Sequence, residues 1–223
     1  MMSAGRQAGL LYLLLGVTGA FSTLYVPGQL FVADDPQATL ERISASPLLL
    51  KLGIASGLFS DVMFMGMAVR LFLMLERYGR FAAGLLVVFV VVGVALHFSA
   101  FTNLYAVAPL AEGAEAASGD MAARVMERIE QYELEMGFVE IFWGLWLIPF
   151  GYLVLVSGAI PRVIGFFLVL GGAGYLMNFL GPLLLPDIYV GTTLSVVVAM
   201  ASVIGEMGAI FWLLIMGARN ERY

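Results

Sequence analysis

Five side chains that could do chemistry lie inside long apolar stretches of the sequence. They are three carboxylic acids, the single histidine and an amide, at positions Asp61, His97, Glu140, Asn178 and Glu206. Polar groups of this kind are costly inside a membrane, so their presence predicts a functional site. Carboxylates that share a low-dielectric site cannot all ionise, and we expect at least one to hold a proton near neutral pH. Asp61, His97, Glu140 and Glu206 are therefore the candidate acid–base groups.

The same five positions lie on helical stripes of glycine, alanine or serine. Glu140, for example, is three residues after Gly137 and four before Gly144, which places the three on one face of a helix. Small residues mark the side of a membrane helix that approaches another helix, so these polar groups are expected to face the interior of a bundle. We therefore predict one polar cavity walled by the second to sixth membrane helices, with the first helix peripheral to it.

Two tryptophans and two asparagines are the candidate ligand contacts. Trp143 and Trp146 follow Glu140 closely and could wall an apolar pocket, with Asn103 and Asn178 as polar contacts. The alternative is that the aromatic residues pack against lipid or anchor the helix at the membrane interface.

Other interpretations of the acids and the histidine stay open. Glu140 with His97, and Asp61 with a neighbour, could be hydrogen-bonded pairs that only fix helix register. His97, Glu140 and Glu206 could bind a metal ion, although the sequence has no HExxH and no Glu-x-x-His pair. Haem is less favoured, since one histidine without CxxCH leaves a single axial nitrogen. The sequence identifies no cofactor.

Long apolar segments must position these side chains. Hydrophobic residues make up 61% of the sequence and charged residues 12%, which is typical of a polytopic membrane protein. Pro27 and Pro109 are expected to end the first and third spans. Asp35 and Pro36 predict the start of an interfacial amphipathic helix. The prediction is an all-α, single-domain bundle of six transmembrane helices at about 9–26, 47–76, 81–107, 130–157, 161–185 and 188–217, with the interfacial helix at 36–45 and an extramembrane helical extension at 120–135.

The basic residues predict the orientation of the bundle. Six spans place both termini on one side of the membrane, and the side with more lysine and arginine is the cytoplasmic one. Both termini are therefore predicted to lie in the cytoplasm, in a cell inner (plasma) membrane. Counted at about 1.5 Å per residue, all the candidate acid–base groups except Asp61 lie in the outer half, so the cavity is expected to open outward. The terminal side holds Arg6, Arg70, Arg77, Arg80, Arg162, Arg219 and Arg222, and the other side Arg42, Lys51, Arg124 and Arg128.

Composition also restricts the function. The chain has no cysteine, which excludes disulfides and thiolate chemistry, and it has no basic stripe for nucleic acid. We expect the cavity to bind a lipid or small apolar ligand. A proton-coupled transporter and a non-enzymatic assembly subunit are the alternatives, and an enzyme stays open. The small-residue faces could also join copies of the chain into a homo-oligomer.

Three stretches resemble a known family. They are the opening GLLYLLLGVTGAFSTLYV, the segment ADDPQATLERISASPLLLKLGIASGLFSDVM and SGAIPRVIGFFLVLGGAGYL at 157–176, whose turn Ser157-Gly158-x-x-Pro161-Arg162-x-x-Gly165 is the most specific part. Together they are similar to the bacterial domain-of-unknown-function 4386 family over nearly the whole chain. The resemblance implies a small multi-pass membrane protein without an assigned activity, and it brings no catalytic residues.

Overall fold

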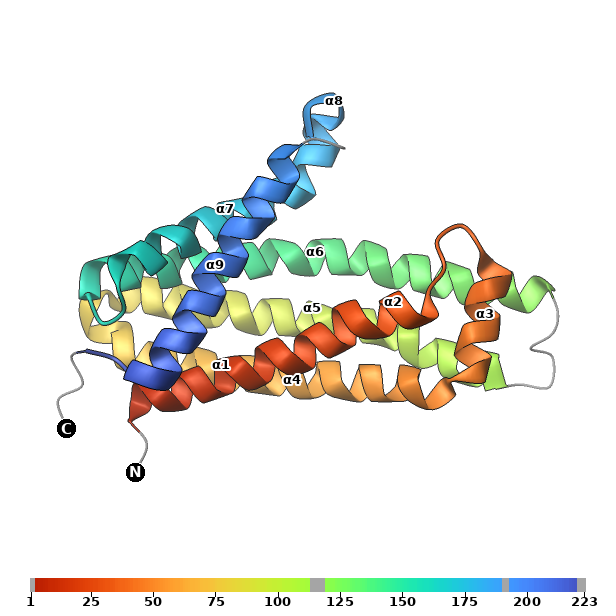
Figure 1. Ribbon diagram of the computed structural model, residues 1–223, viewed down its shortest axis with the longest axis horizontal. Coiled ribbons are helices and arrows are strands. Elements are labelled where there is room, and N and C mark those ends of the chain that lie inside the picture. The colour runs from red at the N-terminus through yellow and green to blue at the C-terminus, as the bar shows by residue number, and fades with distance from the viewer. Residues whose placement is uncertain (1–2, 113–118, 190–192, 220–223) are drawn as a thin grey trace. The chain divides into compact units, whose positions relative to one another are not determined.

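Helices form every element in the described part of the chain, which comprises residues 3–112, 119–189 and 193–219 of a computed structural model (Figure 1). Five segments are long and apolar enough to cross a membrane, and a shorter apolar stretch, Met200–Met216, follows them. The chain is therefore an all-helical, multi-pass membrane protein. The helices are α1 (Ala4–Ala20), the π-helix η1 (Phe21–Tyr25), α2 (Val26–Leu30), α3 (Pro36–Ala45), α4 (Pro47–Leu75), the 3-10 helix η2 (Glu76–Tyr78), α5 (Arg80–Glu112), α6 (Gly119–Ser157), α7 (Arg162–Leu184), α8 (Pro186–Tyr189) and α9 (Thr193–Met216).

The helices contribute to two compact units. The first, here called the terminal unit, contains Met1–Leu13, Met63–Val94 and Gly137–Tyr223. The second, here called the α3 unit, contains Leu14–Val62 and Ala95–Met136. Each unit has its own buried polar residues and its own packing, and each is described by itself below.

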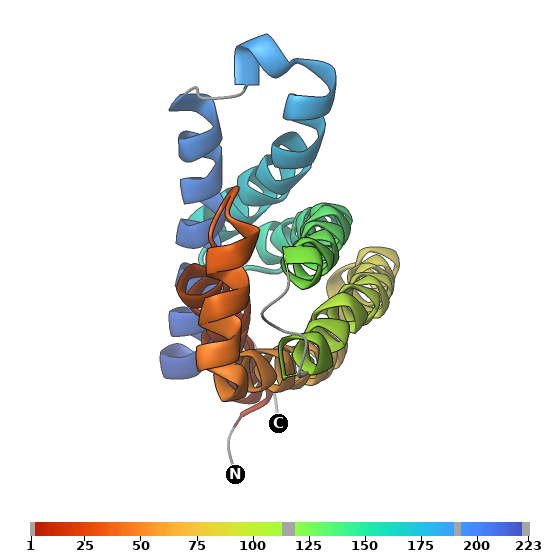
Figure 2. The same cartoon turned by 90° about the vertical axis from the view of Figure 1, so that its right-hand side faces the viewer.

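Glycines set the close packing of the terminal unit. A Cβ atom on Gly171 of α7 would lie 2.4 Å from the Cα atom of Ser202 on α9, so the two helices meet backbone to backbone. Figure 2 shows α7 and α9 as two neighbouring helices, with α8 at the end of α7. At the other end of α9, Arg6 Nη2 donates a hydrogen bond of 3.0 Å to the carbonyl of Ile215. The start of α1 and the end of α9 therefore lie side by side.

Serine hydroxyls join two helices of the α3 unit. Ser56 Oγ donates to the carbonyl of Thr18 at 2.9 Å, and Ser60 Oγ donates to the carbonyl of Leu15 at 3.2 Å. These bonds hold α1 against α4 without placing a free hydroxyl in the apolar interior. The apolar core beside them draws on α2 to α6 and includes Leu30, Leu40, Ile43, Leu50, Phe101, Leu104, Val125 and Ile129.

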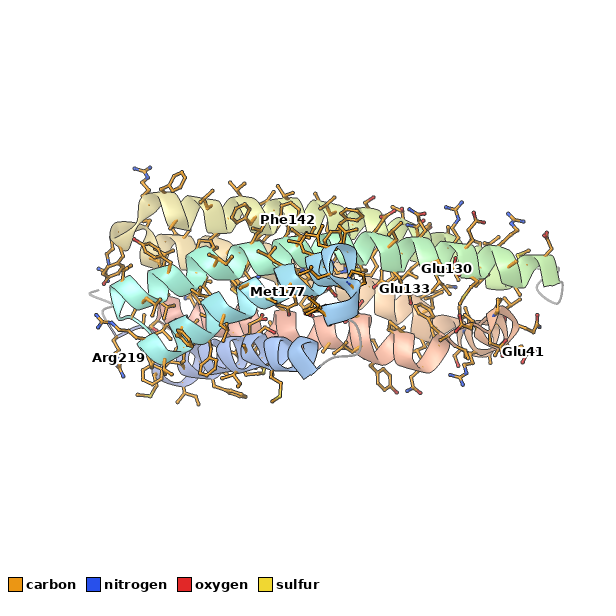
Figure 3. All side chains as sticks on the ribbon, turned by 90° about the horizontal axis from the view of Figure 1, so that it is seen from above. Glu41, Glu130, Glu133, Phe142, Met177 and Arg219 are labelled. Carbon is orange, nitrogen blue, oxygen red and sulfur yellow. The ribbon has the colours of Figure 1, made fainter. Side chains whose placement is uncertain are left out.

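The short helix α3 occupies the range at which the sequence predicts an interfacial helix. Its N-cap is Asp35, whose Oδ1 accepts the N–H of Ala38 at 2.9 Å, and Pro36 opens its first turn. Three acids of the α3 unit, Glu41 on α3 and Glu130 and Glu133 on α6, are exposed and appear in Figure 3. This distribution agrees with a solvent-facing end for this unit.

The predicted helix ends at two prolines are wrong. The helix that begins at Ala4 continues through Pro27 to Leu30, because the π-helical turn before it widens the backbone: the N–H of Val26 bonds the carbonyl of Phe21, five residues back. The wider turn relieves the clash that a proline ring makes with the preceding turn. The third span likewise continues past Pro109 to Glu112, where a proline near the helix end removes only one backbone bond. The predicted sixth helix from Ile188 crosses residues 190–192, which lie outside the described ranges; on either side of them the structure has α8 and α9.

Candidate functional site

The five polar residues singled out in the sequence are divided between the two units. Glu140, Asn178 and Glu206 belong to the terminal unit, whereas Asp61 and His97 belong to the α3 unit. Each unit thus contains a buried polar cluster of its own. A single cavity lined by all five residues stays a prediction.

Glu206 of α9 is held by two tyrosine hydroxyls in the terminal unit. Tyr12 Oη of α1 donates a hydrogen bond of 2.8 Å to one carboxyl oxygen, and Tyr175 Oη of α7 donates one of 3.3 Å to the other. The position of Tyr12 follows from a close approach three residues earlier, where a Cβ atom on Gly9 would lie 2.5 Å from the backbone nitrogen of Leu214. The first helix therefore contributes directly to this cluster, and the expectation that it is peripheral is wrong.

Both tryptophans proposed from the sequence contact these tyrosines. Trp146 meets Tyr12 edge-on, with ring centroids 5.7 Å apart, and Trp143 meets Tyr175 in the same way at 6.2 Å. Trp146 is itself fixed by Phe64 at 5.1 Å and by stacking on Phe150 at 5.5 Å. Such edge-to-face contacts are favourable and orient the rings. The tyrosine hydroxyls thus reach Glu206 from a rigid aromatic wall.

Glu140 of α6 lies on the face that packs against α7. Gly144, one turn further along, would place a Cβ atom 2.6 Å from the carbonyl oxygen of Gly172, so the two helices touch there. The half-buried Glu140 carboxylate is close enough for its charge to act on the hydroxyls of Tyr175 and Tyr189. We call Tyr12, Glu140, Tyr175 and Glu206 the carboxylate–tyrosine cluster. In the described part of the chain, no hydrogen bond to Glu140 is formed.

Asn178 lies at the α8 end of the terminal unit. Its side-chain oxygen accepts a hydrogen bond from Tyr189 Oη, and Tyr189 is buried. Burial and then the nearby Glu140 carboxylate raise the pKa of the Tyr189 phenol above its ordinary value. Tyr189 therefore stays a neutral donor at neutral pH and fixes the orientation of the Asn178 amide.

Asp61 and His97 form a buried pair in the α3 unit. His97 Nδ1 and Asp61 Oδ1 are 2.9 Å apart, and each residue is only 3% exposed. The ring of Phe101, one helical turn after His97, lies 4.4 Å from the imidazole. An ionised Asp61 accepts the Nδ1 proton and so fixes the tautomer of His97. Asp61 Oδ2 has no hydrogen-bond partner among the described residues.

Asn103 belongs to a different network of the α3 unit. Its amide nitrogen donates to Glu135 Oε1 at 3.1 Å, and its oxygen accepts from the exposed Arg128 at 3.5 Å. Asn103 lies further along α5 than His97, and its partners Glu135 and Arg128 lie on the charged first half of α6. Within the described ranges, no three histidines or acids come together as metal ligands.

A family model described as a domain of unknown function, DUF4386, matches residues 7–217. The chain belongs to the DUF4386 family. No curated protein and no solved structure matches it. The description of DUF4386 assigns no activity, so the function of this DUF4386 protein has to be argued from its own clusters.

Sequence reasoning missed the residues that pair with the acids. Tyr12 and Tyr175 were not candidates, because tyrosine is unremarkable inside a membrane helix. A signal for Tyr12 is nevertheless present: Gly5, Ala8, Gly9 and Tyr12 are the buried residues of α1 and share one helical face. A stripe of small residues that ends in a tyrosine could have placed that hydroxyl in the interior.

Proposed function

We propose that this membrane protein binds the polar end of a lipid or small apolar ligand at the carboxylate–tyrosine cluster. The observation that carries the proposal is the arrangement around Glu206, which two tyrosine hydroxyls hold against the aromatic wall of Trp143 and Trp146. Ligand sites are mostly apolar, with a few polar groups fixed in position. The cluster has this composition.

Glu140 supplies the acceptor that a ligand would use. Its carboxylate is half-buried, faces α7 and accepts no hydrogen bond within the described residues, whereas Glu206 already accepts two. A carboxylate without a donor is costly in a membrane. A ligand whose polar end donates hydrogen bonds or carries a positive charge would remove that cost. We therefore expect an amphiphile such as an amine or alcohol with an apolar body.

Exposed apolar side chains on α7 and α9 could accommodate the apolar body of such a ligand. Met177 and Leu180 on α7 and Val203 and Met207 on α9 are exposed, and Figure 3 shows Met177 on α7. These residues belong to the same unit as Glu140 and Glu206 and would contact acyl chains in a bilayer. A ligand could therefore reach the cluster from the membrane. We place the protein in the cell inner membrane with both termini in the cytoplasm, following its basic residues.

Proton-coupled transport is the second candidate function, and one observation favours it. The Tyr175 hydroxyl on α7 donates to Glu206, and Glu140 lies on the face of α6 that packs against α7, so this hydroxyl belongs to the same cluster as two carboxyl groups. A chain of acids and hydroxyls of this kind can pass a proton. In this alternative, the ligand would move together with a proton instead of staying bound.

Native mass spectrometry of the detergent-purified protein tests the proposal. The wild type is compared with Glu140→Gln and Glu206→Gln, and with Glu127→Gln as a matched control, because Glu127 is an exposed acid on the same long helix as Glu140. We expect a stoichiometric ligand in the wild type and in the control, reduced about tenfold or more in the two other variants. Equal occupancy in all four proteins would contradict the proposal. A proton flux in vesicles that ends with Tyr175→Phe would instead support transport.

A further inference from the structure

Two buried side-chain oxygen atoms of the α3 unit lack hydrogen-bond partners, and one of them lies beside Gly57. They are Ser22 Oγ and Asp61 Oδ2, which accept or donate no hydrogen bond within the described part of the chain. Ser22 is 2% exposed and Asp61 is 3% exposed. An unpartnered polar atom in an apolar interior costs about 1–3 kcal/mol. A bound group that contacts both atoms would remove this cost.

Gly57 shows how close the three helices are at this point. A Cβ atom on Gly57 would lie 2.6 Å from Ser22 Oγ and 2.1 Å from Phe101 Cζ, so α4 touches both η1 and α5 there. Asp61 follows Gly57 by one helical turn, and His97 precedes Phe101 by one turn. Ser22 Oγ and the Asp61–His97 pair therefore lie about one helical turn apart along the contact of α4 with η1 and α5.

The backbone at Ser22 offers a second oxygen. In the π-helical turn η1, the N–H of Val26 bonds the carbonyl of Phe21, five residues earlier. The next donor in that register would be residue 27, but Pro27 has no N–H. The carbonyl of Ser22 therefore keeps an acceptor position. In membrane transporters, sodium ions are coordinated by backbone carbonyls that have no helical hydrogen-bond partner because the helix is irregular there.

The charge of the Asp61–His97 pair also calls for a cation. A neutral His97 that donates its Nδ1 proton to an ionised Asp61 leaves one net negative charge in a buried place. Among the described residues, Asp61 pairs with His97 and with no lysine or arginine. Tyr132 of α6 is the other titratable group near Asp61, and its neutral phenol does not balance the charge.

We propose that Ser22 and Asp61 bind a sodium ion in the α3 unit. Hard cations prefer carboxylate, carbonyl and hydroxyl oxygens, and these are the groups that Asp61 and Ser22 present. One positive charge balances one carboxylate, whereas a divalent ion would leave an excess charge. The close contact of the helices at Gly57 leaves little room there, which favours sodium over the larger potassium ion. This inference does not depend on the carboxylate–tyrosine cluster, which belongs to the other unit.

Thermal unfolding of the full-length protein in detergent tests the sodium site. At pH 8, sodium chloride at ten times the dissociation constant should raise the melting temperature by about 3–6 °C. Equal concentrations of potassium or choline chloride, which match the ionic strength, should not. Equal responses to the three salts would overturn the proposal, as would the absence of any stabilisation by sodium.

Variants assign the response to the two side chains. Ser22→Ala and Asp61→Asn should each abolish the sodium-specific shift, and both should lose binding of radioactive sodium. Ser60→Ala is the matched control, because Ser60 is equally buried on α4 but its hydroxyl already donates to the carbonyl of Leu15. Ser60→Ala should keep the sodium-specific rise in melting temperature, even if its melting temperature without sodium is lower than that of the wild type. Retention of the shift in Ser22→Ala would contradict the site, and this test stands if Asp61→Asn does not fold.

Discussion

Replacing Tyr12 with phenylalanine tests the packing and the hydrogen bonding of the carboxylate–tyrosine cluster together. The substitution removes one hydroxyl and leaves the ring, which Trp146 contacts edge-on. The lost hydrogen bond to Glu206 is 2.8 Å long, whereas the remaining one from Tyr175 is 3.3 Å long. Hydrogen bonds to charged groups contribute about 1.5–3 kcal/mol in water-soluble proteins, and measured values in a membrane bundle average about 0.6 and reach about 1.7 kcal/mol. We expect Tyr12→Phe to lower the free energy of unfolding by about 1.5 kcal/mol.

The longer bond from Tyr175 should be worth less. Tyr175→Phe is expected to cost about half as much as Tyr12→Phe, since hydrogen bonds weaken with distance. Tyr152→Phe is the control, because Tyr152 is 49% exposed on α6 and its loss should change the free energy by less than about 0.5 kcal/mol. Unfolding in mixed micelles gives these values, and a double-mutant cycle with Glu206→Gln isolates the pair. If Tyr12→Phe matched the control, or if the cycle showed no coupling, the assignment of Tyr12 to Glu206 would be refuted.

Two further substitutions test the packing of the α3 unit and the start of its short helix. Gly57→Ala should destabilise the protein by about 1–3 kcal/mol, since the new methyl group would lie 2.1 Å from the buried Phe101 ring. Gly84→Ala is the control: a Cβ atom at Gly84 has nothing within 4 Å, so this substitution should be neutral or stabilising by up to about 1 kcal/mol. Equal effects of the two substitutions in unfolding experiments would contradict the close packing at Gly57. Asp35→Ala should cost about 1 kcal/mol by removing the N-cap bond to Ala38, and hydrogen exchange should become faster in the first turn of α3 but not in α4.

The membrane fold could be predicted from the sequence because hydrophobicity and helix length carry that information locally. Apolar runs gave the long helices, Asp35 and Pro36 gave the start of α3, and small residues marked helix contacts such as Gly144 against α7. Helix ends at prolines could not be predicted in the same way. The continuation of the first helix through Pro27 depends on the π-helical turn before it, and no residue type in the sequence indicates such a turn.

The candidate site was predictable only in part, for a related reason. An acid such as Glu206 inside an apolar run is conspicuous, because burial of a charge has few explanations. Its partner Tyr12 lies 194 positions away and is an ordinary residue for a membrane helix. The pairing of His97 is a similar case: the sequence suggested Glu140 as a partner, and the α3 unit supplies Asp61 instead. Long-range pairing depends on the fold, which local patterns do not specify.

A crystal structure of the protein grown from a lipidic mesophase, after purification with its native lipids, tests ligand binding at the carboxylate–tyrosine cluster most directly. We expect electron density for a polar group within hydrogen-bonding distance of Glu140, with an apolar tail that extends along α7 or α9. Density for lipid tails alone, together with a Glu140 carboxylate that is paired with a side chain of the protein, would contradict it.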